Sequence, residues 1–110
     1  SRLTFATPRD RARCVREIAF AMYNGGSAGV KPALRAYLLE QGARSVTYAQ
    51  FQASFRTYVR NHYADGMDLF KGKNKEAKLD AKRRQVAAYA PEIASREAEL
   101  ATAAGKECTL

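Results

Sequence analysis

The sequence predicts an all-α fold, a small bundle of three core helices followed by a basic, kinked C-terminal helix. Two observations lead to this prediction. Apolar residues recur at the three- and four-residue spacing of amphipathic helices along most of the chain. Glycine-containing segments, at residues 24–27 and at Gly42, interrupt this spacing where helices would end. We therefore divide the chain into a helical core, residues 1–70, and a basic, alanine-rich helical extension, residues 71–110.

The first helix is expected from about Pro8 to Tyr23, because Thr7 is a good N-cap and proline suits the first helical position. Its inward-facing residues would be Ala12, Val15, Ile18, Ala19 and Met22. A second helix follows residues 24–27, tolerates Pro32 in its first turn and ends near Gly42. Its inward-facing residues would be Val30, Leu34, Tyr37, Leu38 and Gln41.

The third helix begins in the stretch TYAQFQASFRTYVR, residues 47–60. Thr47 and Gln50 have the spacing of a capping box, and Val46 and Phe51 that of a hydrophobic staple. The residues that share its apolar face are Tyr48, Phe51, Phe55, Tyr58 and Val59. A helix, a short turn containing Gly42 and a second helix with a sharply defined start are typical of a helix-turn-helix, although other small helical bundles share this pattern.

The sequence changes character after His62. Residues 62–66 should end the third helix, and Met67, Leu69 and Phe70 form a short apolar segment that we expect to return to the core. Residues 71–84, KGKNKEAKLDAKRR, contain seven basic and two acidic residues. This run is either a solvated helix face or connector, or an arm that contacts phosphates.

The last stretch is rich in alanine and helical in pattern, with one proline. Pro91 should kink the helix or start a new one, because it removes an intrahelical hydrogen bond. A thin apolar stripe is formed by Val86, Tyr89, Ile93, Ala94, Ala98 and Ala101. This stripe would pack across the three-helix core or pair with a second chain.

Charge and composition narrow the function classes. The chain of 110 residues has 19 Lys and Arg against 11 Asp and Glu, a net charge of +8, which favours polyanionic partners. It has no apolar run near the roughly 20 residues that span a bilayer, and residues 1–11 lack the apolar segment of a signal peptide. Cys14 and Cys108 stand far apart, as expected of reduced thiols in the cytoplasm.

Catalytic signals are weak, so we expect no enzyme, cofactor or metal site. His62 is the one histidine and has no second ligand at metal-binding spacing. Cys14 lies among arginines but next to the apolar face, where a small buried hydrophobe is the favoured interpretation. Residues 24–29 are rich in glycine but lack the Lys-Ser or Lys-Thr of a phosphate-binding loop.

The polar face of the third helix is the candidate nucleic-acid site, because glutamine and arginine make bidentate contacts with base edges. The candidate contacts on this helix are Gln50, Gln52, Arg56 and Arg60. Phosphate contacts are expected from Lys31, Arg35, Arg44, Lys73, Lys75, Lys82 and Arg83. Duplex DNA is the expected partner, and a second chain could pair with the C-terminal helix. The alternatives are a basic helical subunit or inhibitor of a ribonucleoprotein, binding RNA or protein, and a pure protein adaptor.

Residues 18–63 also resemble the TraK-like accessory proteins of plasmid transfer, small basic proteins associated with the transfer origin. The residues that carry the resemblance are Gly26, Ser27, Leu38, Glu40, Gly42, Tyr48, Phe51 and Val59. The pattern departs around residues 29–32, where three residues are inserted, and the C-terminal extension has no counterpart. The resemblance implies a DNA-binding accessory factor of plasmid transfer, or a regulator.

Overall fold

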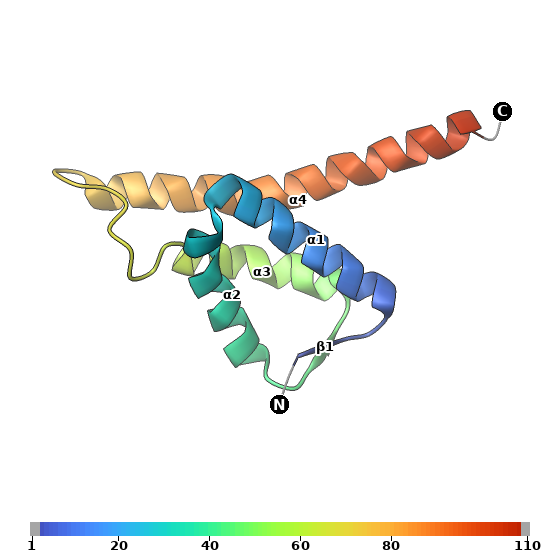
Figure 1. Cartoon of the computed structure of the whole chain (residues 1–110), viewed down its shortest axis with the longest axis horizontal. Coiled ribbons are helices and arrows are strands. Elements are labelled where there is room, and N and C mark those ends of the chain that lie inside the picture. The colour runs from blue at the N-terminus through green and yellow to red at the C-terminus, as the bar shows by residue number, and fades with distance from the viewer. Residues whose placement is uncertain (1–2, 109–110) are drawn as a thin grey trace.

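The computed structural model describes the backbone of residues 3–108 and the side chains of residues 3–97, and it confirms the predicted all-α class (Figure 1). The helices are α1 (Pro8–Gly25), α2 (Ser27–Gln41), α3 (Tyr48–His62) and α4 (Lys75–Cys108). Two short strands, β1 (Thr4–Phe5) and β2 (Ser45–Val46), pair in parallel. Strands of two residues have no repeating pattern, which explains why the sequence did not predict them.

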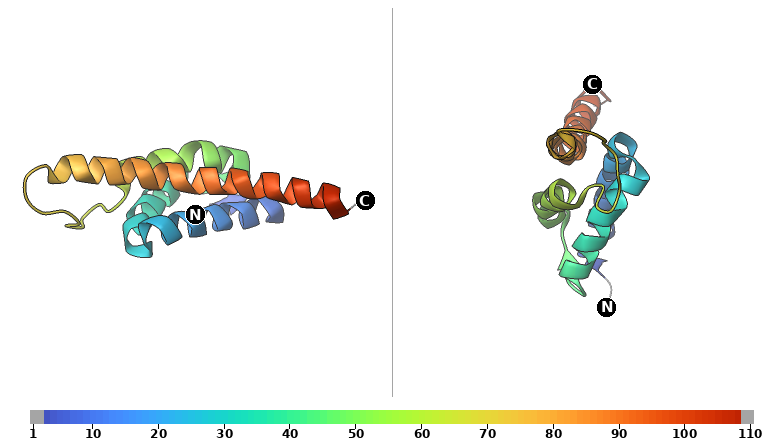
Figure 2. Two further views of the ribbon diagram at one scale, coloured as in Figure 1. Left: turned by 90° about the horizontal axis from the view of Figure 1, so that it is seen from above. Right: turned by 90° about the vertical axis from the view of Figure 1, so that its left-hand side faces the viewer.

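The long helix α4 lies across α1 and α3, and α2 packs mainly against α3 (Figure 2). The β1–β2 pair joins the N-terminal segment to the α2–α3 connection, with Thr4 opposite Ser45 and Phe5 opposite Val46. This pairing fixes the starts of α1 and α3 close to each other.

The predicted helix starts are confirmed in detail. The Thr7 hydroxyl accepts a hydrogen bond from the backbone N–H of Asp10 over 3.0 Å at the start of α1. At the start of α3, the Thr47 hydroxyl accepts from the Gln50 N–H over 3.2 Å, and Gln50 Oε1 accepts from the Thr47 N–H over 3.0 Å. Both arrangements satisfy N–H groups that have no acceptor within the helix, so each start is well defined.

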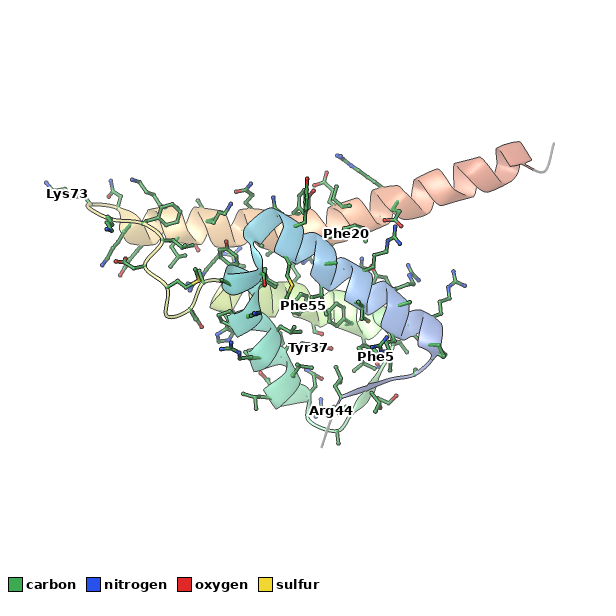
Figure 3. All side chains as sticks on the ribbon, in the orientation of Figure 1. Phe5, Phe20, Tyr37, Arg44, Phe55 and Lys73 are labelled. Carbon is green, nitrogen blue, oxygen red and sulfur yellow. The ribbon has the colours of Figure 1, made fainter. Side chains whose placement is uncertain are left out.

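The aromatic core between α2 and α3 is centred on Tyr37 (Figure 3). Its ring makes edge-to-face contacts with Phe51 at 5.3 Å, Phe55 at 5.7 Å and Tyr58 at 5.3 Å between ring centroids. Phe51 and Phe55 stack on each other at 4.7 Å. The predicted apolar face of α3 is therefore confirmed as core.

Helix α4 joins this core through its small side chains. Val86, Ala87 and Ala90 are buried. A Cβ atom added to Gly25 would lie 2.7 Å from Cγ1 of Val86, so glycine is needed for α4 to approach the end of α1 this closely. Of the predicted α4 stripe, Ala98 and Ala101 lie outside the described side chains.

The predicted inward face of α1 is wrong in part. Ala12, Val15 and Ala19 are exposed, whereas the buried residues of α1 are Cys14, Glu17 and Ala21. The helix is rotated from the predicted phase because Glu17 is buried and hydrogen-bonded, which an apolar count cannot anticipate. Leu38 on α2 is also 43% exposed and does not belong to the core.

In the C-terminal half, one expectation needs correction and one of the two alternatives for Pro91 is excluded. Met67 and Leu69 do not return to the core but stay about two-fifths exposed, at 40% and 41%. Helix α4 does not restart at Pro91 but runs through it as one helix. Figure 1 shows that the axis of α4 changes direction along its length, as expected when proline removes one hydrogen bond of the helix.

Candidate nucleic-acid interface

One side of α3 faces away from the three other helices. Its exposed residues are Ala49, Gln50, Ala53, Arg56, Thr57, Arg60 and Asn61. Arg56 and Arg60 are four residues apart, and Ala49 and Ala53 precede them on the same face. Helix α3 contains no acidic residue, so its exposed face combines positive charge, polar groups and small side chains. We call these seven residues the α3 face.

Gln52 does not belong to the α3 face, although the sequence analysis assigned it there. Its side chain is half-buried, and Nε2 lies 3.0 Å from the Tyr48 hydroxyl oxygen and 3.3 Å from Oε1 of Glu17. Its amide donor is thus engaged inside the protein. The side chain of Gln50 is exposed, but its oxygen is occupied by the capping box.

The partner of Gln52 is a buried carboxyl group on α1. Glu17 is 1% exposed, and Oε1 accepts a hydrogen bond from the Tyr48 hydroxyl over 2.7 Å. Burial raises the pKa of Glu17, while the hydrogen bonds from Tyr48 and Gln52 and the positive charges of Arg13 and Arg56 act in the opposite direction. This cluster ties α1 to the beginning of α3.

Arg13 completes the connection between α1 and α3. Its guanidinium lies over the ring of Tyr48, 4.0 Å from the centroid, in a cation–π arrangement. Arg13 and Arg56 are both exposed and both close enough to Glu17 to affect its pKa. A positively charged region therefore continues from the α3 face onto α1. Arg13 was not predicted as a site residue, because its partner Tyr48 is distant along the chain.

The remaining predicted cations do not form one patch. Lys31, Arg35 and Arg44 are all exposed, the first two on α2 and the third in the α2–α3 connection. Figure 3 shows Arg44 and Lys73 far apart, Arg44 at the bottom of the view and Lys73 at its left-hand end. These cations are therefore spread over the surface of the protein.

The basic run at the start of α4 divides into two kinds of residue. Lys73 and Lys75 are exposed, Lys73 in the loop before α4 and Lys75 as its first residue, and Lys82 is half-buried. Arg83 is engaged within the protein: Nε donates to the Tyr63 carbonyl oxygen over 2.8 Å, and Nη2 lies 2.8 Å from Oδ1 of Asp65. Arg83 thus joins α4 to the end of α3.

The candidate catalytic residues are also held in structural contacts. Burial raises the pKa of the Cys14 thiol to about 12, which leaves it protonated and unreactive at neutral pH. Nδ1 of His62 lies 2.8 Å from Oδ2 of Asp65, the carboxylate that also binds Arg83. Among the described residues, no three His, Cys, Asp or Glu side chains gather in a way that could hold a metal ion. The side chain of Cys108 lies outside the described residues.

Within residues 3–108 there is no helix of the length and apolar character needed to cross a bilayer. No protein-family model matches the chain, and neither a curated protein nor a solved structure is significantly similar to it.

Proposed function

We propose that this protein is a non-enzymatic, cytoplasmic nucleic-acid-binding protein that contacts duplex DNA through the α3 face. One observation carries the proposal. The exposed face of α3 combines Arg56 and Arg60 with the small residues Ala49 and Ala53, and the helix contains no acidic residue. Small side chains let a helix approach a groove closely, and the arginines can then reach base edges or phosphates.

The overall charge supports the same conclusion. A net charge of +8 on 110 residues favours a polyanion, because neutralised phosphates release counterions. Arg13 beside the α3 face, and Lys73 and Lys75 at the start of α4, are further phosphate contacts in this proposal. On the basis of the resemblance to TraK-like proteins, the proposal includes a cellular role as an accessory factor of plasmid transfer or as a regulator.

The test compares duplex DNA, single-stranded DNA and RNA by fluorescence anisotropy at two salt concentrations. Replacing Arg56 or Arg60 with alanine should weaken binding to a preferred duplex by about 1–3 kcal/mol if the arginine reads a base, and much less on random duplexes. Arg96→Ala is the matched control, because it removes one exposed positive charge that is paired with Glu92 on α4. Equal binding by all three variants would remove the α3 face from the proposal.

A second candidate function is a basic helical subunit or inhibitor of a ribonucleoprotein. The observation that favours it is the set of exposed apolar side chains, above all Tyr23 at 86% and Leu39 at 84%, which suit contact with a protein surface. A preference for RNA or single strands over duplex DNA in the same anisotropy series would favour this function.

A homodimer through α4 is a further part of the proposal. Helix α4 extends well beyond the other three helices (Figure 1), which leaves its C-terminal part available to a second copy. Sedimentation equilibrium over a range of protein concentrations tests this. A constant monomer mass at every concentration would count against the dimer.

A further inference from the structure

A hollow lies between the loop that follows α3 and the first turns of α4, and none of its lining residues belongs to the α3 face. Its volume is about 200 Å³, and it is lined by Met67, Asp68, Leu69, Phe70, Lys75, Glu76 and Leu79. Sites for drug-sized molecules measure roughly 300 to 1,000 Å³. The hollow therefore has room for one small ring system or one side chain, and not for a larger cofactor.

The wall of the hollow combines four apolar side chains with three charged ones, and it is partly open to solvent. Met67 and Leu69 are 40% and 41% exposed, while Phe70 and Leu79 are half-buried. Leu79 also packs against the core, which anchors one side of the hollow to the bundle. Exposed apolar side chains around a cavity suit a ligand with a flat or apolar group that can cover them.

The segment that forms the hollow is rich in lysine. Lysines at positions 71, 73, 75 and 78 are all exposed, and Lys75 also lines the hollow. In the part of the chain whose side chains are described, none of them forms an ion pair. Figure 3 shows Lys73 pointing away from the protein at the tip of this loop. A ligand that complements the apolar side chains of the hollow and the lysines of this segment combines an apolar ring with negative charge.

Two carboxylates in the lining narrow the ligand further. Asp68 and Glu76 accept hydrogen bonds and repel any anionic group inside the hollow, so the negative charge of the ligand would lie outside it, near the lysines. Adenine, cytosine and guanine carry exocyclic amino donors that a carboxylate accepts, whereas unpaired thymine and uracil offer it only the ring N3–H. The lining thus suits an amino-bearing nucleobase.

We propose that this hollow binds one unpaired nucleobase of a single-stranded segment, with the adjoining phosphates on the lysines at positions 71, 73, 75 and 78. The inference rests on the proposed nucleic-acid binding and adds a second site to it. A base stacked on Phe70 would attach a strand end or an overhang beside the duplex held by the α3 face. Phosphate contacts by long lysine side chains need no fixed geometry, so lysines of the loop and of the first turn of α4 can both take part.

The chain offers a direct reporter, because it contains two methionines and Met67 lines the hollow while Met22 lies on α1. Protein labelled with ¹³C at the methionine methyl groups is titrated with single-stranded tetradeoxyadenylate and, separately, tetrathymidylate. A Met67→Leu variant assigns the two signals. We expect the Met67 signal to shift with the adenine strand, the Met22 signal to stay in place, and the thymine strand to bind more weakly.

A second measurement separates this site from the α3 face. A four-nucleotide adenine overhang on a duplex should improve the affinity by about tenfold over the blunt duplex. A gain of this size is expected when one base stacks on an aromatic side chain. Phe70→Ala and Leu69→Ala should each reduce this overhang advantage and leave blunt-duplex binding unchanged. Arg56→Ala should do the reverse. Thermal unfolding of each variant identifies one that has lost its fold.

The outcomes are distinct. If blunt duplexes fail to bind while the Met67 signal responds to adenine strands, the α3 face proposal is wrong and the hollow remains a base site. If duplexes bind but the overhang adds nothing, or if both folded variants at positions 69 and 70 keep the advantage, the hollow is not a base site. A Met67 shift with a Glu- and Leu-containing peptide, and none with adenine strands, would also overturn the inference.

Discussion

The hydroxyl of Tyr48, the first residue of α3, donates a hydrogen bond to the buried carboxyl group of Glu17 on α1 over 2.7 Å. Together with the pairing of β1 and β2, this contact positions α3 relative to α1. It also withdraws Gln52 from the solvent, since the Gln52 amide lies against the same two groups. A buried residue on another helix therefore decides whether the Gln52 amide belongs to the exposed surface of α3.

Removing the Tyr48 hydroxyl should destabilise the protein. Tyr48→Phe keeps the ring under Arg13 but leaves Glu17 with the longer contact to Gln52 alone. A buried hydrogen bond to a charged or polar acceptor of this kind contributes about 1–3 kcal/mol to the free energy of unfolding. Urea denaturation measures the loss. Tyr23→Phe is the control, because that side chain is 86% exposed and its hydroxyl should matter little. Equal stability of the two variants would contradict the structural role of this bond.

The raised pKa of Glu17 predicts a specific pH dependence of stability. Burial lifts its folded pKa above the ordinary 4.5, so the folded state holds the proton more tightly than the unfolded state does. The contribution of Glu17 is thus fully present below pH 4.5 and is lost as pH rises through the higher folded pKa. Parent protein should gain stability relative to Glu17→Gln as pH falls from neutral towards 4.5.

The comparison of the parent protein with Glu17→Gln removes the contributions of the other titrating groups, because both proteins contain them. Hydrogen bonds from Thr7 and Tyr48 lower the pKa of Asp10, so its stabilising effect is lost as pH falls below its ordinary 3.8. Both proteins retain Asp10, and its effect drops out of the difference in unfolding free energy. A difference that does not vary between pH 4.5 and 8 would show that Glu17 is not buried as described.

The buried face of α3 was predicted correctly because it consists of large residues at helical spacing. Burial of Phe51, Phe55 and Val59 on this face removes their apolar surface from water. The buried face of α1 was predicted wrongly, because Ala12, Val15 and Ala19 form an apolar stripe that stays exposed. The buried stripe includes Glu17, whose burial depends on a tyrosine 31 residues further along the chain. Local spacing has no access to such a partner.

The candidate site was predictable to a similar extent. Arg56 and Arg60 follow from the phase of α3, since they lie opposite its apolar face. Gln52 lies at the edge of that face, where only tertiary contacts decide whether its amide is free. In the sequence, Arg83 is one member of a basic run. Its contacts with Tyr63 and Asp65 form only because α4 packs on the end of α3.

The contact between Tyr63 and Gly29 provides a steric prediction. A Cβ atom on Gly29 would lie 2.6 Å from Cε1 of Tyr63. This clash opposes the usual effect of the substitution, since alanine normally stabilises a helix by about 1 kcal/mol relative to glycine. Gly29→Ala should therefore destabilise the protein, by about 1–3 kcal/mol as for other overpacked sites. In a Tyr63→Leu background the same change should cost far less. A double-mutant cycle by urea denaturation measures this coupling, and additive effects would place the ring elsewhere.

The last prediction separates the two kinds of cation at the start of α4. Lys73 and Lys75 are exposed, so replacing both with glutamine should leave stability unchanged and flatten the dependence of log K on log salt for duplex DNA. The slope should fall by about 0.9 for each phosphate contact that is lost. Anisotropy titrations of a random duplex at three salt concentrations give this slope.

Arg83→Gln is the matched variant, because it removes one positive charge from the same run and breaks contacts inside the protein. It leaves the Tyr63 carbonyl oxygen and the Asp65 carboxylate without the guanidinium, so the free energy of unfolding should fall. The salt slope should stay at the parent value, since a guanidinium bound to Asp65 is not available to a phosphate. If Arg83→Gln instead flattened the slope without loss of stability, Arg83 would be a phosphate contact and its contacts with Tyr63 and Asp65 would be dispensable.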